Sequence, residues 1–489
     1  MHRKHKIKGE FFVKTEELFE RAPVWKSIFK MCLPTVVIML VITVYNMADM
    51  VFVGQTGIAA QVAAVSLASP FFLLQMTFGT WIGGGGCTVI STALGAKDTE
   101  KAKSASAACT LLSLASGVLL GGAALLFPNA FLHFFGADAA TWDYTAQYLQ
   151  ILALGTPVVV FSNVFANLVR AEGAVQVAVM LNMLGTVANI ILDPLFISGL
   201  NLGVQGAAIA TVLGNVLTAL GLLFYLRRRD TILTLNMRKA FHMPHVFREI
   251  FTLGIPGSVS NLLMSAVNTI TNRIVIAYGA DTVAEMGAGG KAGMIVAMVV
   301  MAIALGVQPM FAYLYGAGNT ARLRETFRKS GILAVSLGIV LSVVCFIFRF
   351  PICGLFLKDE ALVASAAHIT ALGLLGMPLI GVYYLAVNYL QSVGKAAQAS
   401  VLSVLRQGAV YVPLLLSLHG LFGLFGVFYA APAADIFSTL LAVFLLYRAI
   451  KKISSPQSRI RPQKSKIPSK NQLNFHILSM TFSLASVIL

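Results

Sequence analysis

The sequence predicts an all-α integral membrane protein, with twelve transmembrane helices in two six-helix lobes that are related by a parallel internal repeat. The composition, the length of the apolar runs and the spacing of glycines and prolines support this prediction. Of the 489 residues, 57% are hydrophobic and only 11% are charged, whereas about 25% of the residues of an ordinary soluble domain are charged. This composition excludes a soluble enzyme of several domains.

Each predicted helix is an apolar run long enough to cross a bilayer. A hydrocarbon core about 30 Å thick needs roughly 20 apolar residues in one helix. Clusters of charge or turns of Gly, Pro and Asn separate twelve such runs. In order along the chain they are 31–53, 60–93, 104–127, 143–168, 176–198, 204–226, 250–277, 284–314, 330–350, 365–391, 398–418 and 424–447.

The basic residues predict the orientation of these helices. If the N-terminus is cytoplasmic, the cytoplasmic segments carry 31 of the 36 Lys and Arg, and the outer segments carry only Lys291, Arg349 and Lys358. Such an excess is typical of the cytoplasmic side of a membrane protein. We therefore expect a multi-pass protein of the cell membrane with both termini in the cytoplasm. The net charge of +17 then requires no nucleic acid as a partner.

Two halves of the chain repeat each other. Pro34 and Pro256 are 222 residues apart, and Gly95 and Gly316 are 221 apart. Because each half has an even number of spans, the halves enter the membrane from the same side and form a parallel repeat. The predicted parts are a cytoplasmic amphipathic N-terminus (1–30), an N-lobe (31–226), a cytoplasmic linker (227–249), a C-lobe (250–448) and a basic cytoplasmic tail (449–489).

Two aspartates inside the N-lobe spans are candidates for a cation site, because ionisable side chains inside a membrane are costly. Asp49 lies roughly 27 Å and Asp193 roughly 26 Å from the cytoplasmic face, at 1.5 Å per residue. Asn189 precedes Asp193 by one helical turn, and Thr211 lies near the same depth. These oxygens suit Na⁺ or a proton held on a buried carboxylate. The alternative is that each Asp caps a broken helix or binds a backbone group.

A second pair of charges lies at mid-depth in the C-lobe. Arg406 is in the eleventh span and Asp435 in the twelfth, which is expected to form a hairpin with it. Two interpretations stay open for this pair, a structural ion pair and a second coupling site.

Several motifs resemble those of the multidrug and toxic compound extrusion (MATE) family. They are Pro34 with the stretch from Asn46 to Gly54, Asn189-x-x-x-Asp193-Pro194, Gly206-Ala207-Ala208-Ile209-Ala210-Thr211, Gly306-Val307-Gln308-Pro309, the stretch from Tyr315 to Asn319, and Arg170-x-x-Gly173.

The resemblance implies a drug/cation antiporter in which two lobes form a V around a central cavity. It implies that Asp49, Asn189, Asp193 and Thr211 form the cation site, with Asp49 and Asp193 as ligands if the ion is Na⁺. It also implies that Pro34 is a position at which the first span bends. Members that couple through the C-lobe carry acids in the seventh and tenth spans; this chain has none deep there, so coupling is expected in the N-lobe.

The sequence thus predicts a secondary active multidrug exporter, not an enzyme. H⁺ or Na⁺ would move inward as amphipathic, cationic compounds move outward. We expect a monomer in the lipid bilayer, with no cofactor besides the coupling ion and no use of ATP, because no GxxxxGK[ST] motif is present.

The main alternative is a flippase for a lipid-linked sugar or another polar lipid. Its cavity would need Arg and Lys for phosphates, and Arg406 and Arg273 are the only candidates within the spans. A membrane-embedded enzyme or a pore is a further alternative, but the spans hold almost no histidine and no stretch resembles a selectivity filter.

Overall fold

The structure is a computed structural model that describes residues 15–54, 59–228 and 231–453, although the side chains of 44–54 in the first long helix are not described. The helices up to Tyr447 belong to one compact unit. Arg448–Leu489 form a second unit, of which only 448–453, the last turns of a helix, are described.

The first group of helices follows the predicted N-lobe closely. A short π-helix, η1 (Glu17–Arg21), precedes it. The group consists of α2 (Val24–Gly54), α3 (Ala59–Gly95), α4 (Thr99–Leu126), α5 (Pro128–Phe135), α6 (Trp142–Ala171), α7 (Val175–Pro194), the π-helix η2 (Leu195–Gly199) and α8 (Gly203–Arg228).

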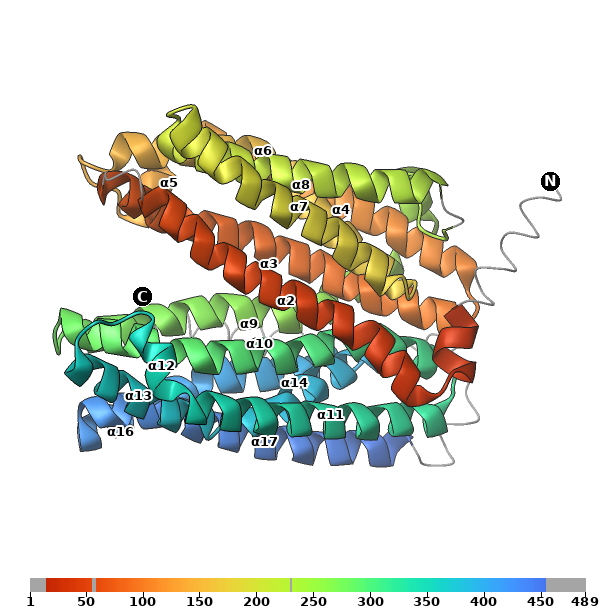
Figure 1. The fold of residues 1–489 in the computed structure, drawn as a ribbon. Helices are drawn as coiled ribbons and strands as arrows, with labels where there is room; N and C mark the ends of the chain where they lie inside the picture. The colour runs from red at the N-terminus through yellow and green to blue at the C-terminus, as the bar shows by residue number, and fades with distance from the viewer. Residues whose placement is uncertain (1–14, 55–58, 229–230, 454–489) are drawn as a thin grey trace, which may run out of the picture. The chain divides into compact units, whose positions relative to one another are not determined.

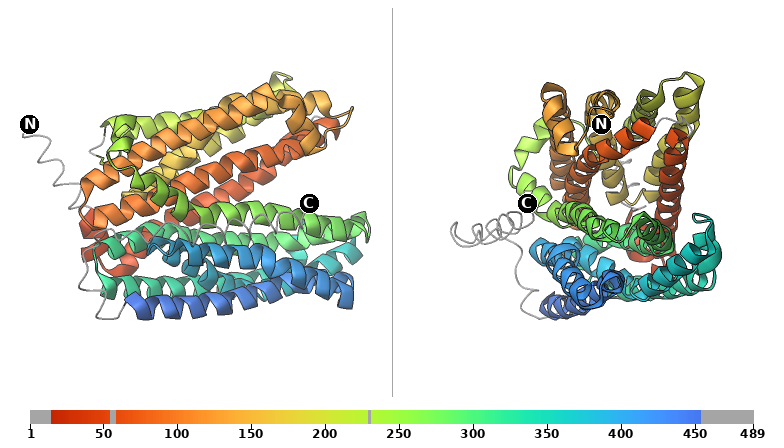
Figure 2. Two further views of the ribbon diagram at one scale, coloured as in Figure 1. Left: turned by 180° about the vertical axis from the view of Figure 1, so that it is seen from behind. Right: turned by 90° about the vertical axis from the view of Figure 1, so that its left-hand side faces the viewer.

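The second group begins after a 3₁₀ helix in the linker, η3 (Met237–His242). It consists of α9 (His245–Ile276), α10 (Ala280–Gly316), α11 (Thr320–Ile347), α12 (Arg349–Gly354), α13 (Glu360–Leu374), α14 (Met377–Ser392), α15 (Ala396–Val404), the π-helix η4 (Leu405–Ala409), α16 (Tyr411–Phe422) and α17 (Leu424–Ile453). The two groups lie side by side in all views (Figure 1, Figure 2).

Eleven spans in the described part of the chain are long and apolar enough to cross a membrane. A twelfth is formed by α13 and α14, which bend by 45° relative to each other at a short break. Every predicted run therefore corresponds to a helix or to a broken helix. The described residues contain no strand, and the all-helical prediction is confirmed.

The repeat is visible in how the helices end and begin. The Asp98 side chain accepts a hydrogen bond from the backbone N–H of Lys101 at the start of α4, and Asn319 accepts one from Arg322 at the start of α11. Such side chains satisfy the unpaired donors of a first helical turn. The residue before each cap has a positive φ, which is 60° at Lys97 and 70° at Gly318. The two connections thus share one backbone conformation.

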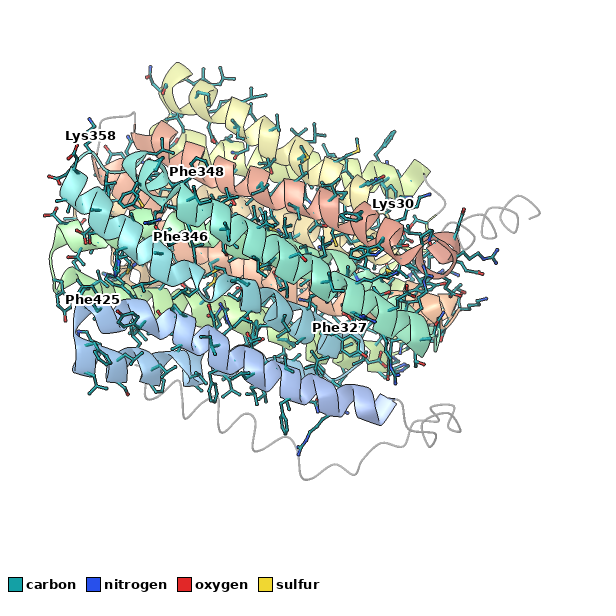
Figure 3. All side chains as sticks on the ribbon, turned by 60° about the horizontal axis from the view of Figure 1, so that its bottom comes forward. Lys30, Phe327, Phe346, Phe348, Lys358 and Phe425 are labelled. Atoms are coloured by element: carbon teal, nitrogen blue, oxygen red, sulfur yellow. The ribbon has the colours of Figure 1, made fainter. Side chains whose placement is uncertain are left out.

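Basic side chains gather at the end of the bundle where α2 begins, and we call this end the basic end. The residues that define it are Lys26, Lys30, Lys97, Lys101, Lys103, Arg248, Arg322, Arg324, Arg328 and Lys329. Lys30 lies at this end, whereas Lys358 and Phe425 lie at the opposite end (Figure 3). The polar and charged connections between spans therefore alternate between a strongly basic end and a weakly charged one.

The two groups are joined by close backbone contacts that only glycine permits. A Cβ on Gly85 of α3 would lie 2.0 Å from the carbonyl oxygen of Ile250 in α9, and a Cβ on Gly254 would lie 1.9 Å from that of Trp81. Nearer the basic end, the same test on Gly95 of α3 gives 2.0 Å to the Tyr313 oxygen of α10. The backbones of these helices therefore touch with no side chain between them.

Candidate functional site

Two close contacts hold α7 against α8 on either side of the predicted cation site. A Cβ on Gly185 of α7 would lie 2.5 Å from the carbonyl oxygen of Gly214 in α8. Toward the other end, a Cβ on Gly206 would lie 2.6 Å from the carbonyl carbon of Phe196 in η2. The polar residues between these contacts are therefore held in a tight helix–helix interface.

Asn189 and Asp193 lie in this interface and contact each other. The Asn189 amide Nδ2 donates a hydrogen bond of 3.2 Å to Asp193 Oδ1. Asp193 is fully buried, with 0% of its surface exposed, and Thr211 of α8 is buried as well, at 8%. A carboxylate in this position is costly unless polar groups or an ion compensate it. The predicted pairing of an amide with a buried carboxylate is therefore present in the structure.

Asp193 also lies where the helix changes its geometry. Pro194 ends α7, and the chain continues directly as the π-helix η2. π-helical turns are often found at functional sites, but a carboxylate at a helix break also fits the alternative interpretation stated above. The local geometry is compatible with both.

The third predicted member, Asp49, lies near the end of α2 at Gly54, and its side chain is outside the described residues. At the level of helices, α2 packs against α7. Among the side chains that the structure describes, no three His, Cys, Asp or Glu gather so that they could hold a metal ion. A sodium site would thus depend on Asp49, and its meeting with Asp193 stays a prediction.

Two polar residues that the sequence analysis did not single out extend the site toward α6. Asn215 of α8 donates to the carbonyl oxygen of Thr211 at 2.9 Å, and its Oδ1 accepts a hydrogen bond of 3.0 Å from Ser162. Both are neutral, so a search for charges inside spans passes over them. Their signal was the i, i+4 spacing of Thr211 and Asn215 on one helix face.

Pro34 lies inside α2, which is helical without interruption from Val24 to Gly54. Proline removes one hydrogen bond from a helix interior, so Pro34 weakens α2 at this position. A bend at Pro34 in another state stays a prediction.

The C-lobe charges form an ion pair. Arg406 Nε lies 2.9 Å from Asp435 Oδ1, and the two side chains are 12% and 7% exposed. The guanidinium also lies over two aromatic rings, 5.1 Å from the ring centre of Tyr383 and 5.5 Å from that of Tyr384. The predicted pair is therefore present, well buried and surrounded by aromatic residues of α14.

A buried carboxylate outside the spans was missed by the sequence analysis. Glu172 follows the end of α6, and its carboxylate accepts hydrogen bonds from the Thr231 hydroxyl at 2.6 Å, the backbone N–H of Ile232 at 2.8 Å and that of Leu233 at 3.3 Å. The Tyr225 hydroxyl donates a further bond. Burial raises the pKa of Glu172 to about 7, although these hydrogen bonds oppose the shift. Glu172 therefore anchors the linker to the first group of helices.

Comparison with known proteins gives consistent matches over most of the chain. The MatE family model matches residues 34–195 and again 256–417. The second match starts 222 residues after the first (256 against 34), which is the separation of Pro34 and Pro256. The parallel repeat is thereby confirmed.

Individual relatives and solved structures agree with the family model. The chain is 31% identical over 442 residues to the multidrug export protein MepA of Staphylococcus aureus (strain N315), covering 89% of this chain and 96% of that protein. It is also 31% identical to MepA of Staphylococcus haemolyticus (strain JCSC1435), with the same coverage. A crystal structure of MATE in complex with MaL6 matches with a TM-score of 0.84 at 24% identity, covering 90% of this chain and 98% of that one.

Proposed function

We propose that this chain, which belongs to the multidrug and toxic compound extrusion (MATE) family, is a secondary active exporter of amphipathic, cationic compounds, driven by inward movement of H⁺ or Na⁺. The relatives named above are multidrug export proteins. The transported compounds cross a membrane without chemical change, and the coupling ion is the only cofactor that the proposal needs. We further propose that the protein acts as a monomer.

The observation that carries the coupling proposal is the buried Asn189–Asp193 pair between α7 and α8. Asp193 is fully buried in a helix interface of a membrane protein, so its charge has a large effect on the local free energy. A bound proton or Na⁺ would neutralise it. Asp49 would complete the site from α2, because that helix packs against α7.

We propose that the basic end is cytoplasmic, on the basis of its excess of Lys and Arg. The glycine contacts Gly85–Ile250 and Gly95–Tyr313 then close the protein toward the cytoplasm, and the cation would bind from outside. Occupation of the aspartates would change the packing of α2 on α7, expel the exported compound and favour separation of the lobes at the basic end. Such a cycle requires that the cation binds the two states with different affinity.

The test is ethidium efflux from proteoliposomes under an imposed proton gradient or an imposed sodium gradient. We expect one of the two gradients to drive efflux in the wild type, and Asp193→Asn and Asp49→Asn to abolish the driven component, because a neutral amide cannot exchange the ion. Asp143→Asn is the matched control, since Asp143 is exposed in the first turn of α6.

Full gradient-driven efflux by both N-lobe variants would refute the coupling site. An absence of efflux in the correctly folded wild type under either gradient would refute the exporter proposal itself.

A further inference from the structure

Three helix irregularities meet at Asp435, at mid-depth of the second group. The first is the break between α13 and α14, where a Cβ on Gly376 would lie 3.1 Å from Asp435 Oδ2. The second is the π-helix η4, which carries Arg406. The third is Pro432 inside α17, whose Cα would lie 3.4 Å from the same Cβ. In transporters, discontinuous helices at mid-membrane typically mark a binding site.

Arg406 has donors to spare. Within the described part of the chain its one hydrogen bond is the bond from Nε to Asp435 Oδ1. An arginine has five N–H donors in a planar fork, so the two Nη groups keep four donors without an acceptor. The side chain retains 12% of its surface exposed. Exposure of these donors to lipid would be costly, so they are more favourably placed in a polar, ligand-accessible space.

The surroundings of Arg406 indicate what the ligand looks like. The guanidinium contacts the rings of Tyr383 and Tyr384, and such faces suit stacking with a flat aromatic ligand. The remaining Nη edge matches the geometry of a carboxylate, which arginine binds through two parallel hydrogen bonds. Asp435 holds Nε and thereby fixes the plane of the guanidinium.

We propose that the Nη edge of Arg406 is a second ligand site, which binds the carboxylate of an aromatic solute between the α13/α14 break, η4 and α17. The proposal deepens the exporter function, on which it rests for its role in transport: it adds aromatic acids and zwitterions to the compounds the protein carries. A structural ion pair alone would leave the Nη donors unused. It would also give no reason for three breaks to meet at one buried pair.

The experiment measures binding separately from transport, so that its failure can be distinguished from failure of the exporter proposal. The purified full chain in phosphatidylcholine nanodiscs is titrated with anthracene-2-carboxylate and with the neutral anthracene-2-carboxamide, and the intrinsic fluorescence of the ligand is followed. We expect Arg406→Gln to weaken binding of the carboxylate by about 10- to 100-fold, the usual contribution of a charged hydrogen bond. Binding of the carboxamide should change by less than about 3-fold, within the range of a single neutral hydrogen bond.

Two further variants keep the test decisive if Arg406→Gln leaves Asp435 as an unpaired buried charge and impairs folding. The double variant Arg406→Gln/Asp435→Asn removes both charges and should lose the carboxylate preference as well. Asp435→Asn alone keeps the guanidinium and should bind the carboxylate at least as tightly as the wild type. Arg273→Gln, on the exposed side of α9, is the matched control.

Equal loss of both ligands in the Arg406 variants, or loss of carboxylate binding in Asp435→Asn, would assign the pair a purely structural role. Absence of a carboxylate preference in the wild type would overturn the proposal directly.

Discussion

Replacing Gly85 by alanine tests whether the glycine contacts close the basic end. The added Cβ would lie 2.0 Å from the Ile250 carbonyl oxygen, whereas ordinary contact begins at 3.4 Å, so α3 and α9 would have to move apart by the difference of about 1.4 Å. Both atoms belong to backbone and neither can rotate away. Overpacking of this kind costs about 1–3 kcal/mol. The clash exists only while the lobes are in contact, so the cost falls on this state alone.

A free-energy change of about 1–3 kcal/mol corresponds to a shift of about 5- to 150-fold in the equilibrium between two conformations. We therefore expect Gly85→Ala to raise the population of the state that is open at the basic end by that factor. Spin labels at Glu100 and Arg328, one exposed position on each group of helices at this end, would report the shift as a longer distance in electron–electron resonance. The five native cysteines are buried, which favours selective labelling.

Gly84→Ala is the matched control, because a Cβ on Gly84 would meet only the Gln391 side chain at 3.7 Å, an ordinary contact. It adds the same methyl group to the same helix one residue away. A distance distribution for Gly85→Ala that matches those of Gly84→Ala and the wild type would refute the assignment of these glycines to closure.

Two predictions concern charges at the basic end. Glu172→Ala should destabilise the protein by about 2–5 kcal/mol, because the backbone N–H groups of Ile232 and Leu233 lose their acceptor. Since burial raises the pKa of Glu172 from 4.5 to about 7, the folded state favours the protonated form. The stability of the wild type should therefore fall as pH rises from about 4.5 to 7, by about 3 kcal/mol at 1.36 kcal/mol per unit, and level off above. Thermal unfolding of Glu172→Gln should lack this component, and an identical pH profile would contradict the prediction. Lys101 and Glu249 pair across the two groups at 2.8 Å, partly exposed, so Lys101→Glu should increase opening at the basic end by a few-fold. The exchange variant Lys101→Glu/Glu249→Lys should restore the wild-type distance between the same spin labels, and no rescue would show that the pair does not act in closure.

The helices of this protein were predictable because the signal for them is local. A run of about 20 apolar residues leaves few alternatives in a bilayer, and the structure places a helix or a broken helix at each of the twelve runs. The Asn189–Asp193 contact was also predictable, because residues four apart on a helix share one face. The ion pair of Arg406 with Asp435 followed from matching depth in neighbouring spans.

Other features depended on which helices meet, and single spans carry no information about that. Gly85 and Gly254 are two of 42 glycines, and nothing in their local sequence distinguishes them from Gly84, which makes no close contact. Glu172 looked like an ordinary loop acid, because the donors that surround it come from residues 231–233, about sixty positions further on.

The sequence by itself thus determined the membrane class, the spans, the repeat and the family, because hydrophobicity, periodicity and motif spacing are properties of the linear chain. Only the tertiary structure decided which glycines let backbones touch, which carboxylate anchors the linker, and that three helix breaks meet at Asp435. These depend on distances between segments far apart in the chain, and such distances exist only once the helices have packed.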